Sequence, residues 1–341
     1  MALWPLVTTV LALTSAQLAA GQSPDSTGQD LARAVAARPR DPAAQSRYAV
    51  FLEQQGRSEE ALAHFQAALD LAPQSAEYAF NLALAMLHLS RAAESLAVLD
   101  RHPATSADHL LLRGAVLNAL DRPADAAVAL RRAVALEPAN PDSLYDLALT
   151  LLKINASAEA TALLDSGRRR FPGVAKLHAA SGMVAYLHGK NADAVRAYEA
   201  AVKLEPGAAD LFASLGDVYD ATGDLVRAGA SYGKSLRLDS SVATVHVKLG
   251  RNHLKLQHPR EAGEAFAAAL QRDPANSAAH FELGKLAAAR GDHDAAISHY
   301  RQAVVSTPAL KEAWYQLGIS YRRAGQEEQS LAALEQFRKL P

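Results

Sequence analysis

The sequence predicts an all-α chain, built as a tandem array of antiparallel helix pairs. Its 341 residues repeat a pattern of small, aromatic and proline positions every 34 residues from Ala107 onward. Each period contains two apolar stretches with the 3.6-residue spacing of amphipathic helices, separated by a turn. Half of the residues are hydrophobic but only 6% are aromatic, and alanine dominates, a composition that favours closely packed helices over strands.

The first 21 residues predict a cleaved secretory signal peptide. They carry no charged side chain, and an apolar run from Leu3 to Leu13 is followed by Ala19 and Gly21 before Gln22. No lysine or arginine precedes the apolar run, which leaves an uncleaved membrane anchor as the alternative. We therefore expect a periplasmic or secreted protein. Residues 22–30 predict a flexible linker.

The rest of the chain is assigned to repeats. Residues 31–41 predict the second helix of a partial repeat, and residues 42–341 predict the array itself. The repeats are expected to start at residues 42, 76, 107, 141, 175, 209, 243, 277 and 311. The row from Ala76 is three residues short, because the next row begins 31 residues later.

Aligned on these starts, several columns hold one kind of residue. Column eight is mostly glycine: Gly114, Gly182, Gly216, Gly250, Gly284 and Gly318. Column twenty is mostly alanine: Ala126, Ala194, Ala228, Ala262 and Ala296. Column twenty-four holds Leu, Tyr or Phe, and column thirty-two is usually proline. We expect the small residues at columns eight and twenty to let the two helices of a pair approach closely, beside the larger residue of column twenty-four. Proline ends each pair, and Asp224 is placed to cap a second helix.

A 34-residue period with these columns resembles the tetratricopeptide repeat. The resemblance covers residues 42–341 and implies a right-handed superhelical solenoid of about nine repeats, with a concave groove lined by the first helix of each pair. The tryptophan that this family places at column four is present only as Trp314. Three other rows have His178, His246 and His280 there, for which we expect a partly buried packing role.

The resemblance also implies which residues face the groove, at columns two, five, nine, twelve and thirteen of the first helices. The groove would begin apolar and aromatic, with Phe80, Leu84, Leu111, Tyr145, Leu149, Met183 and Tyr186. It would continue acidic, with Asp217 and Asp220. It would end basic, with Arg251, Lys255, Lys285, Arg322 and Arg323, and with Phe281 and Tyr315 among them. The alternative is that several of the apolar residues pack against adjacent repeats.

The composition argues against several classes of function. The chain has no cysteine, which removes thiolate metal sites and cysteine nucleophiles, and its net charge of −1 gives no bulk attraction to nucleic acid. No two histidines are four residues apart on one helix, as a helical zinc site requires. The segment Gly233–Ser235 resembles the end of a phosphate-binding loop but has Ala228 where the first glycine is needed. We expect no catalytic residue, no metal and no cofactor.

The favoured function is a non-catalytic scaffold of the cell envelope that binds a segment of a partner protein or peptide in its groove. A second interpretation is an accessory subunit of a secretion, pilus or polysaccharide-export machine, and a third is an enzyme. Nucleic acid is not an expected partner. Contact with a membrane is expected only if the leader is retained, and self-association stays open.

Overall fold

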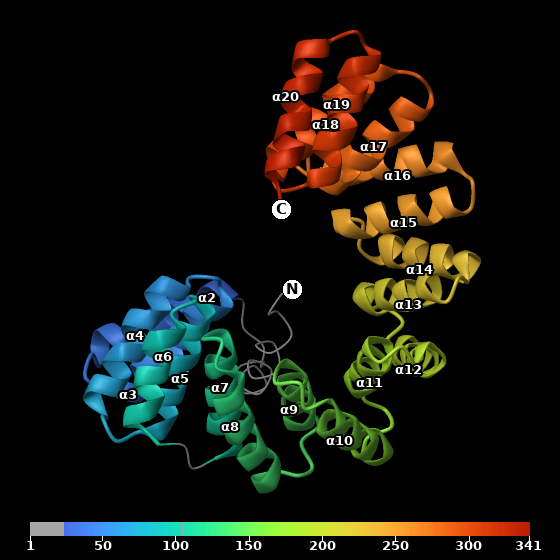
Figure 1. Ribbon diagram of the computed structural model, residues 1–341. Helices are drawn as coiled ribbons and strands as arrows, with labels where there is room; N and C mark the ends of the chain where they lie inside the picture. Colours follow the sequence, from blue (N-terminus) through green and yellow to red (C-terminus); the bar gives the residue numbers. More distant parts are fainter. Residues whose placement is uncertain (1–23, 104–105) are drawn as a thin grey trace. The chain divides into compact units, whose positions relative to one another are not determined.

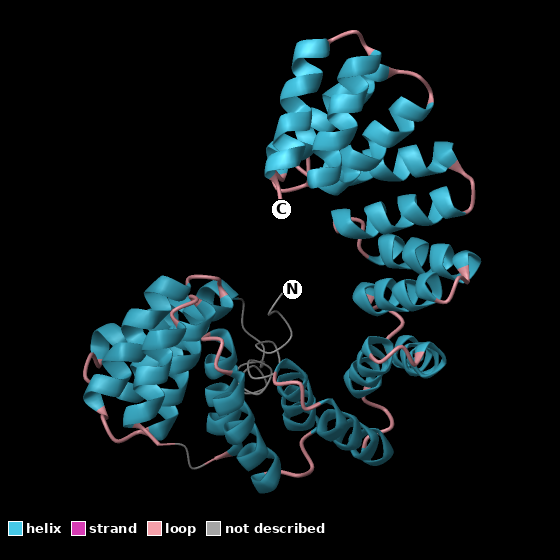
Figure 2. Cartoon of the chain, viewed as in Figure 1, coloured by secondary structure: helices cyan, strands magenta, loops and turns pink. Residues whose placement is uncertain are grey.

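The computed structural model describes residues 24–103 and 106–341, and every regular element in these ranges is a helix (Figures 1 and 2). The prediction of an all-α array of helix pairs is confirmed. The predicted signal peptide lies outside the described residues. No helix in the described ranges is long and apolar enough to cross a membrane.

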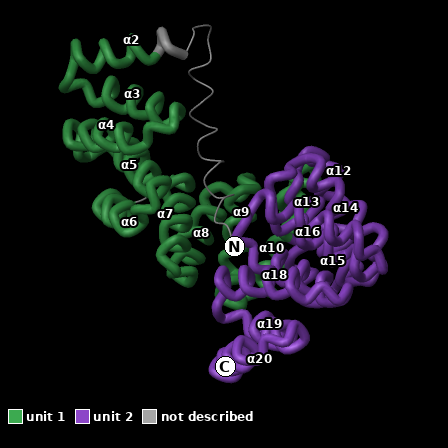
Figure 3. The backbone as a smooth tube through the Cα atoms, turned by 90° about the horizontal axis from the view of Figure 1, so that it is seen from above, with its two compact units in different colours: residues 1–180 green, residues 181–341 purple. Residues whose placement is uncertain are grey.

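The chain divides into two compact units, residues 1–180 and 181–341 (Figure 3). Unit 1 contains α2 (Pro24–Ala37), α3 (Pro42–Gln54), α4 (Ser58–Leu71), α5 (Ala76–His88), α6 (Ala92–Arg101), α7 (Ala107–Ala119), α8 (Pro123–Leu136), α9 (Pro141–Lys153) and α10 (Ser157–Arg170). The boundary falls within α11 (Ala175–Leu187). Unit 2 continues with α12 (Asn191–Leu204), α13 (Ala209–Ala221), α14 (Leu225–Leu238), α15 (Ala243–Lys255), α16 (Pro259–Arg272), α17 (Ser277–Ala289), α18 (His293–Ser306), α19 (Lys311–Arg323) and α20 (Glu327–Lys339).

The odd-numbered helices from α3 to α19 are the first helices of nine pairs, and they begin at the nine residues where the sequence repeats were expected to start. Polar side chains fix several of these starts. Ser75 and Asn276 accept a hydrogen bond from a backbone N–H in the first turn of α5 and α17. Asp224 does the same for the second helix α14 by accepting from the N–H of Arg227 at 3.1 Å, as the sequence predicts.

The turn between the two helices of each pair has one residue with positive φ, always at column fifteen. Five of these nine residues are glycines, including Gly223 with φ +79°. The other four are Ser90, Asp121, Asn155 and Gln257. Asn and Asp tolerate this left-handed conformation, whereas the longer Gln257, at φ +63°, carries backbone strain.

Each pair is held together by the small residues of columns eight and twenty, but the contact differs in detail from the expectation. The column-twenty alanines are fully buried. A β-carbon added to Gly216 would lie 2.6 Å from the ring of Tyr232 at column twenty-four, and Gly250 is placed the same way beneath Phe266. The glycines therefore make room mainly for the large side chain of column twenty-four, rather than for the alanine of column twenty.

The predicted linker over residues 22–30 is wrong where the structure describes it, because α2 begins at Pro24. Proline suits the first turn of a helix, where its missing N–H needs no partner. Gly28, which resembled a linker residue, makes a close helix contact: a β-carbon there would lie 2.6 Å from the ring of Phe51 on α3. The short row from Ala76 has a short second helix, since α6 has 10 residues where α4, α8 and α10 have 14.

Helices pack against their neighbours in the chain, and some first helices also pack against the first helix of the next pair. In unit 1 these contacts join α3 to α5, α5 to α7 and α7 to α9, and in unit 2 they join α17 to α19. Side chains of adjacent first helices can therefore pair across repeats, and this contact positions the candidate site.

Candidate partner-binding face

We define the first-helix face as the side chains at columns two, five, nine, twelve and thirteen of the first helices. Most of its predicted apolar members are partly or well exposed, and the most exposed aromatic rings are Tyr186 at 39% and Tyr315 at 43%. Two predictions are wrong. Leu84 and Leu111 are only 9% and 8% exposed and belong to the hydrophobic cores of unit 1, where they pack against neighbouring repeats.

The charged side chains of unit 2 are arranged differently from the predicted sequence of an acidic and then a basic stretch. Lys248 Nζ on α15 lies 2.7 Å from Asp217 Oδ2 on α13, and Lys255 Nζ lies 2.6 Å from Asp220 Oδ2. Each acidic group therefore has a basic partner from the next first helix. The separate patches do not form, because the contact between adjacent first helices brings opposite charges together.

The same pairing continues between α15 and α17 around one buried carboxylate. Glu282, whose side chain is 7% exposed, accepts from Arg251 Nε at 2.9 Å and from Lys285 Nζ at 2.9 Å. The sequence analysis missed Glu282 because column six was not counted among the groove columns. Burial and the Glu282 charge raise the pKa of Tyr300 to about 12.

Three contacts of aromatic side chains add to the packing of unit 2. Tyr232 donates from its hydroxyl to Asp217 Oδ1 at 2.9 Å, and its pKa is raised by burial and by the Asp217 charge. The ring of Tyr315 lies 5.3 Å from that of Phe337 on α20. The ammonium of Lys285 lies 5.5 Å from the centre of the Phe281 ring.

Arg322 and Arg323 differ from the other predicted basic residues. Both are exposed on the last turn of α19, and within the part of the chain that the structure describes neither forms an ion pair. Their charge is available to a ligand, whereas the charges of Arg251, Lys255 and Lys285 are already compensated inside the array.

Unit 1 has a different polar arrangement on the same face. Lys176 on α11 forms an ion pair with Asp142 on α9, and its ammonium lies 5.6 Å from the centre of the Tyr145 ring. Asp146 lies one turn further along α9, and burial raises the pKa of its carboxyl to about 7, with Asp142 adding to the effect and Lys176 opposing it. The sequence analysis did not identify Asp146 either, again because it occupies column six.

The histidines of column four have a specific structural role. The Nε2 atoms of His178, His246 and His280 lie 3.0 to 3.1 Å from the carbonyl oxygen six residues earlier, at the end of the preceding pair. Trp314 Nε1 donates to the equivalent carbonyl, that of Pro308, at 2.9 Å. Histidine thus replaces the indole N–H of tryptophan, which confirms a packing role. In the sequence, this role is indicated by the occurrence of histidine and tryptophan in the same column of the repeat.

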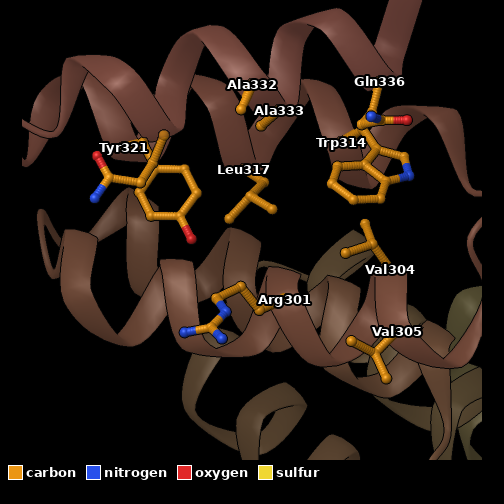
Figure 4. A pocket seen from close by; sticks show the side chains of 10 residues that line it. Arg301, Val304, Val305, Trp314, Leu317, Tyr321, Ala332, Ala333 and Gln336 are labelled. Atoms are coloured by element: carbon orange, nitrogen blue, oxygen red, sulfur yellow. The ribbon is translucent and has the colours of Figure 1, made fainter. Parts of the chain in front are cut away.

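A pocket of about 390 Å³ lies away from the first-helix face, between α18, α19 and α20 (Figure 4). Its lining is mostly apolar, with Arg301, Val304, Val305, Trp314, Leu317, Tyr321, Gln329, Ala332, Ala333 and Gln336. None of these residues was among the predicted site residues, since the sequence analysis considered only groove columns. The described residues contain no group of three side chains able to hold a metal ion.

Comparison with known proteins identifies the repeats. Family models described as tetratricopeptide repeat match residues 12–76, 54–109, 117–182, 180–243, 247–311 and 312–340. The chain belongs to the tetratricopeptide repeat family. The first match begins inside the predicted leader, and together the matches extend over nearly all of the chain. No curated protein matches the chain.

Solved structures of tetratricopeptide type are similar to parts of the chain. The MamA protein is 22% identical over 48% of this chain and 90% of its own, with a TM-score of 0.45. YrrB, described as a TPR protein with an unusual peptide-binding site, is 21% identical over 51% of this chain and 90% of its own, with a TM-score of 0.44. A chain of the APC/C heterotetramer Cut9–Hcn1 is 16% identical over 91% of this chain and 71% of its own, with a TM-score of 0.47.

Proposed function

We propose that the chain is a non-catalytic protein-interaction scaffold of the cell envelope that binds a segment of a partner protein on its first-helix face. The observation that carries the proposal is the exposure of Tyr186 and Tyr315 on this face in a tetratricopeptide repeat chain. Exposed aromatic rings supply large contact areas at a low entropic cost, which is why they are enriched at binding hot spots.

The charges on the face support a role in orienting the partner. The charges of Asp217, Asp220, Arg251 and Lys255 are neutralised by ion pairs between adjacent first helices, and such pairs attract a ligand weakly. Arg322 and Arg323 are available, so we propose that they contact acidic groups of the partner. Charge complementarity of this kind chiefly sets orientation and the rate of association.

In unit 1 a serine, a carboxylate and a histidine lie together, but their contacts are not those of a hydrolase triad. Ser58 Oγ donates to Glu53 Oε2 at 3.0 Å, and His88 Nδ1 lies 3.7 Å from the same oxygen. The serine hydroxyl therefore contacts the carboxylate and not the imidazole, so these three residues lack the serine–histidine hydrogen bond of a hydrolase triad. An accessory subunit of a secretion, pilus or polysaccharide-export machine remains the second candidate, and co-purification with a multisubunit complex would favour it.

The cell-envelope location rests on the leader of residues 1–21 and is part of the proposal. Sequencing the N-terminus of the native protein tests it. We expect a mature chain that begins near Gln22 in the periplasmic or secreted fraction. A soluble cytosolic form that retains Met1 would contradict the location but not the scaffold role.

The binding face is tested once crosslinking in the native envelope and mass spectrometry have identified a partner. Changing Arg322 and Arg323 to Glu should weaken binding more at low than at high ionic strength, because exposed charges are screened over about 8–10 Å. Tyr315→Ala should weaken binding at every salt concentration, by about 1–2 kcal/mol. Val305→Ala, in the pocket on the other face, is the matched control. Loss of binding in the control alone would refute the first-helix face.

A further inference from the structure

Adjacent first helices meet in a fixed register, in which column nine of one repeat contacts column six of the next. In unit 2 this contact holds opposite charges twice: Asp217 with Lys248, and Arg251 with Glu282. Each pair is separated by 31 residues in the sequence. The register thus provides a position where a charge on one helix meets its counter-ion on the next.

The α7–α9 contact in unit 1 lacks the counter-ion at this position. Asp146 occupies column six of α9, and the residue 31 positions earlier, at column nine of α7, is Ala115. Helices α7 and α9 pack against each other, and Ala115 is partly exposed. By this register the Asp146 carboxylate is placed against the Ala115 methyl group, where two boundaries of unit 2 have a charged side chain.

No other group of the described chain replaces the missing counter-ion. Asp146 forms no side-chain hydrogen bond or ion pair within the residues that the structure describes. The cation that acts on it is Lys176, whose ammonium is already bound to Asp142. With Asp142, Asp146 and Lys176 all ionised, the local net charge is negative.

We propose that the surface at Ala115 receives a lysine or arginine side chain of the bound partner, which pairs with the carboxylate of Asp146. This inference rests on the proposed function and names the chemistry of one contact of the partner on the first-helix face. The cation would occupy the place that Arg251, at column nine, fills beside Glu282 in unit 2, with its stem over the alanine methyl. Bound there, it would lie close to the Asp142–Lys176 pair, whose charges cancel.

The raised pKa of Asp146 is consistent with an uncompensated carboxyl in poor contact with water. A bound cation stabilises the ionised form, so binding should release a proton at neutral pH. The charged groups that act on Asp146 are Lys176 from α11, which favours its ionised form, and Asp142 on its own helix, which opposes it.

The first test uses the full chain and a peptide array. Each 12-residue peptide is printed in four versions, with lysine, arginine, norleucine or citrulline at its centre. The expected result for the wild type is a preference of about tenfold for the lysine and arginine versions, since a hydrogen bond to a charged group contributes on this scale. Asp146→Asn should remove the preference, and Asp108→Asn, at an exposed carboxylate of α7, should keep it.

The second test supplies the missing counter-ion from within the chain. Ala115→Arg should lower the pKa of Asp146 well below 7, measured by carbon-13 NMR of labelled aspartate carboxyls, and should abolish the preference for cationic peptides. Ala115→Gln, which adds similar bulk without charge, should leave the preference in place.

The outcomes separate this inference from the function on which it rests. Peptides that bind the wild type without a preference for a cation, or whose preference survives Asp146→Asn, overturn the inference and leave the scaffold role intact. The same holds if Ala115→Arg keeps the preference, or if Ala115→Gln removes it as fully as Ala115→Arg does. An array on which no peptide binds any variant counts against both. Circular dichroism of each variant shows that a loss of preference does not come from unfolding.

Discussion

Gly216→Ala tests the packing of each helix pair most closely. A β-carbon at residue 216 would lie 2.6 Å from Cε1 and 2.7 Å from Cδ1 of Tyr232, where ordinary contacts begin near 3.4 Å. The ring is buried and its hydroxyl donates to Asp217, so it cannot move aside without losing that bond. Overpacking of this kind costs about 1–3 kcal/mol. Alanine gains up to about 1 kcal/mol of helix propensity, so we expect a net loss of roughly 1–2 kcal/mol.

The assay is urea unfolding followed by circular dichroism, with hydrogen exchange of α13 and α14 as a local readout, because repeat arrays do not always unfold in one step. Gly233→Ala is the matched control. Its β-carbon would lie 3.4 Å from the flexible end of Arg237, so the propensity gain should dominate and stability should rise. Tyr232→Leu in the Gly216→Ala background should recover part of the loss. If Gly216→Ala is as stable as the wild type, the packing account is wrong.

Three further predictions concern single residues, and each is tested by measuring the free energy of unfolding. Between pH 5 and pH 7.5 the free energy of unfolding of the wild type should fall by up to about 2 kcal/mol through Asp146. Its pKa is raised to about 7 in the fold, so over this range the unfolded chain is already ionised while the folded protein must give up a proton from a buried site. Asp146→Asn should not show this fall. Glu282→Gln should lower the free energy of unfolding by about 2–3 kcal/mol, because Arg251 and Lys285 lose their buried counter-ion. Glu335→Gln, on the exposed surface, should change stability little. Gln257→Gly should stabilise the chain by about 1 kcal/mol, because glycine relieves the strain of a positive φ.

Much of the fold could be predicted because the repeat is a local pattern. Column eight requires glycine or alanine wherever column twenty-four carries a large side chain, so the period is visible in the sequence itself. The short-range signals also held, as the cap at Asp224 shows. The failure at residues 22–30 has the opposite cause, since Gly28 is explained only by its contact with Phe51 on another helix.

The charge pattern of the face was less predictable because it depends on pairs 31 to 35 residues apart. Counting charges by column placed Asp217 and Arg251 in separate patches. Only the contact between adjacent first helices shows that Lys248 and Glu282, both at column six, neutralise them. The same register shows that Asp146 lacks such a partner. Burial of Leu84 likewise follows from packing between repeats rather than from its column.

The central claim is that a partner protein binds the first-helix face, and site-specific photo-crosslinking in the native cell tests it most directly. A photoreactive amino acid would replace Tyr145 or Tyr315 on that face or, in a third variant, Val305, which is 74% exposed beside the pocket on the other face. The account predicts crosslinks to a partner protein from the positions of Tyr145 and Tyr315, and none to that partner from Val305. Crosslinks from Val305 alone would contradict it and would place the binding surface on the second helices.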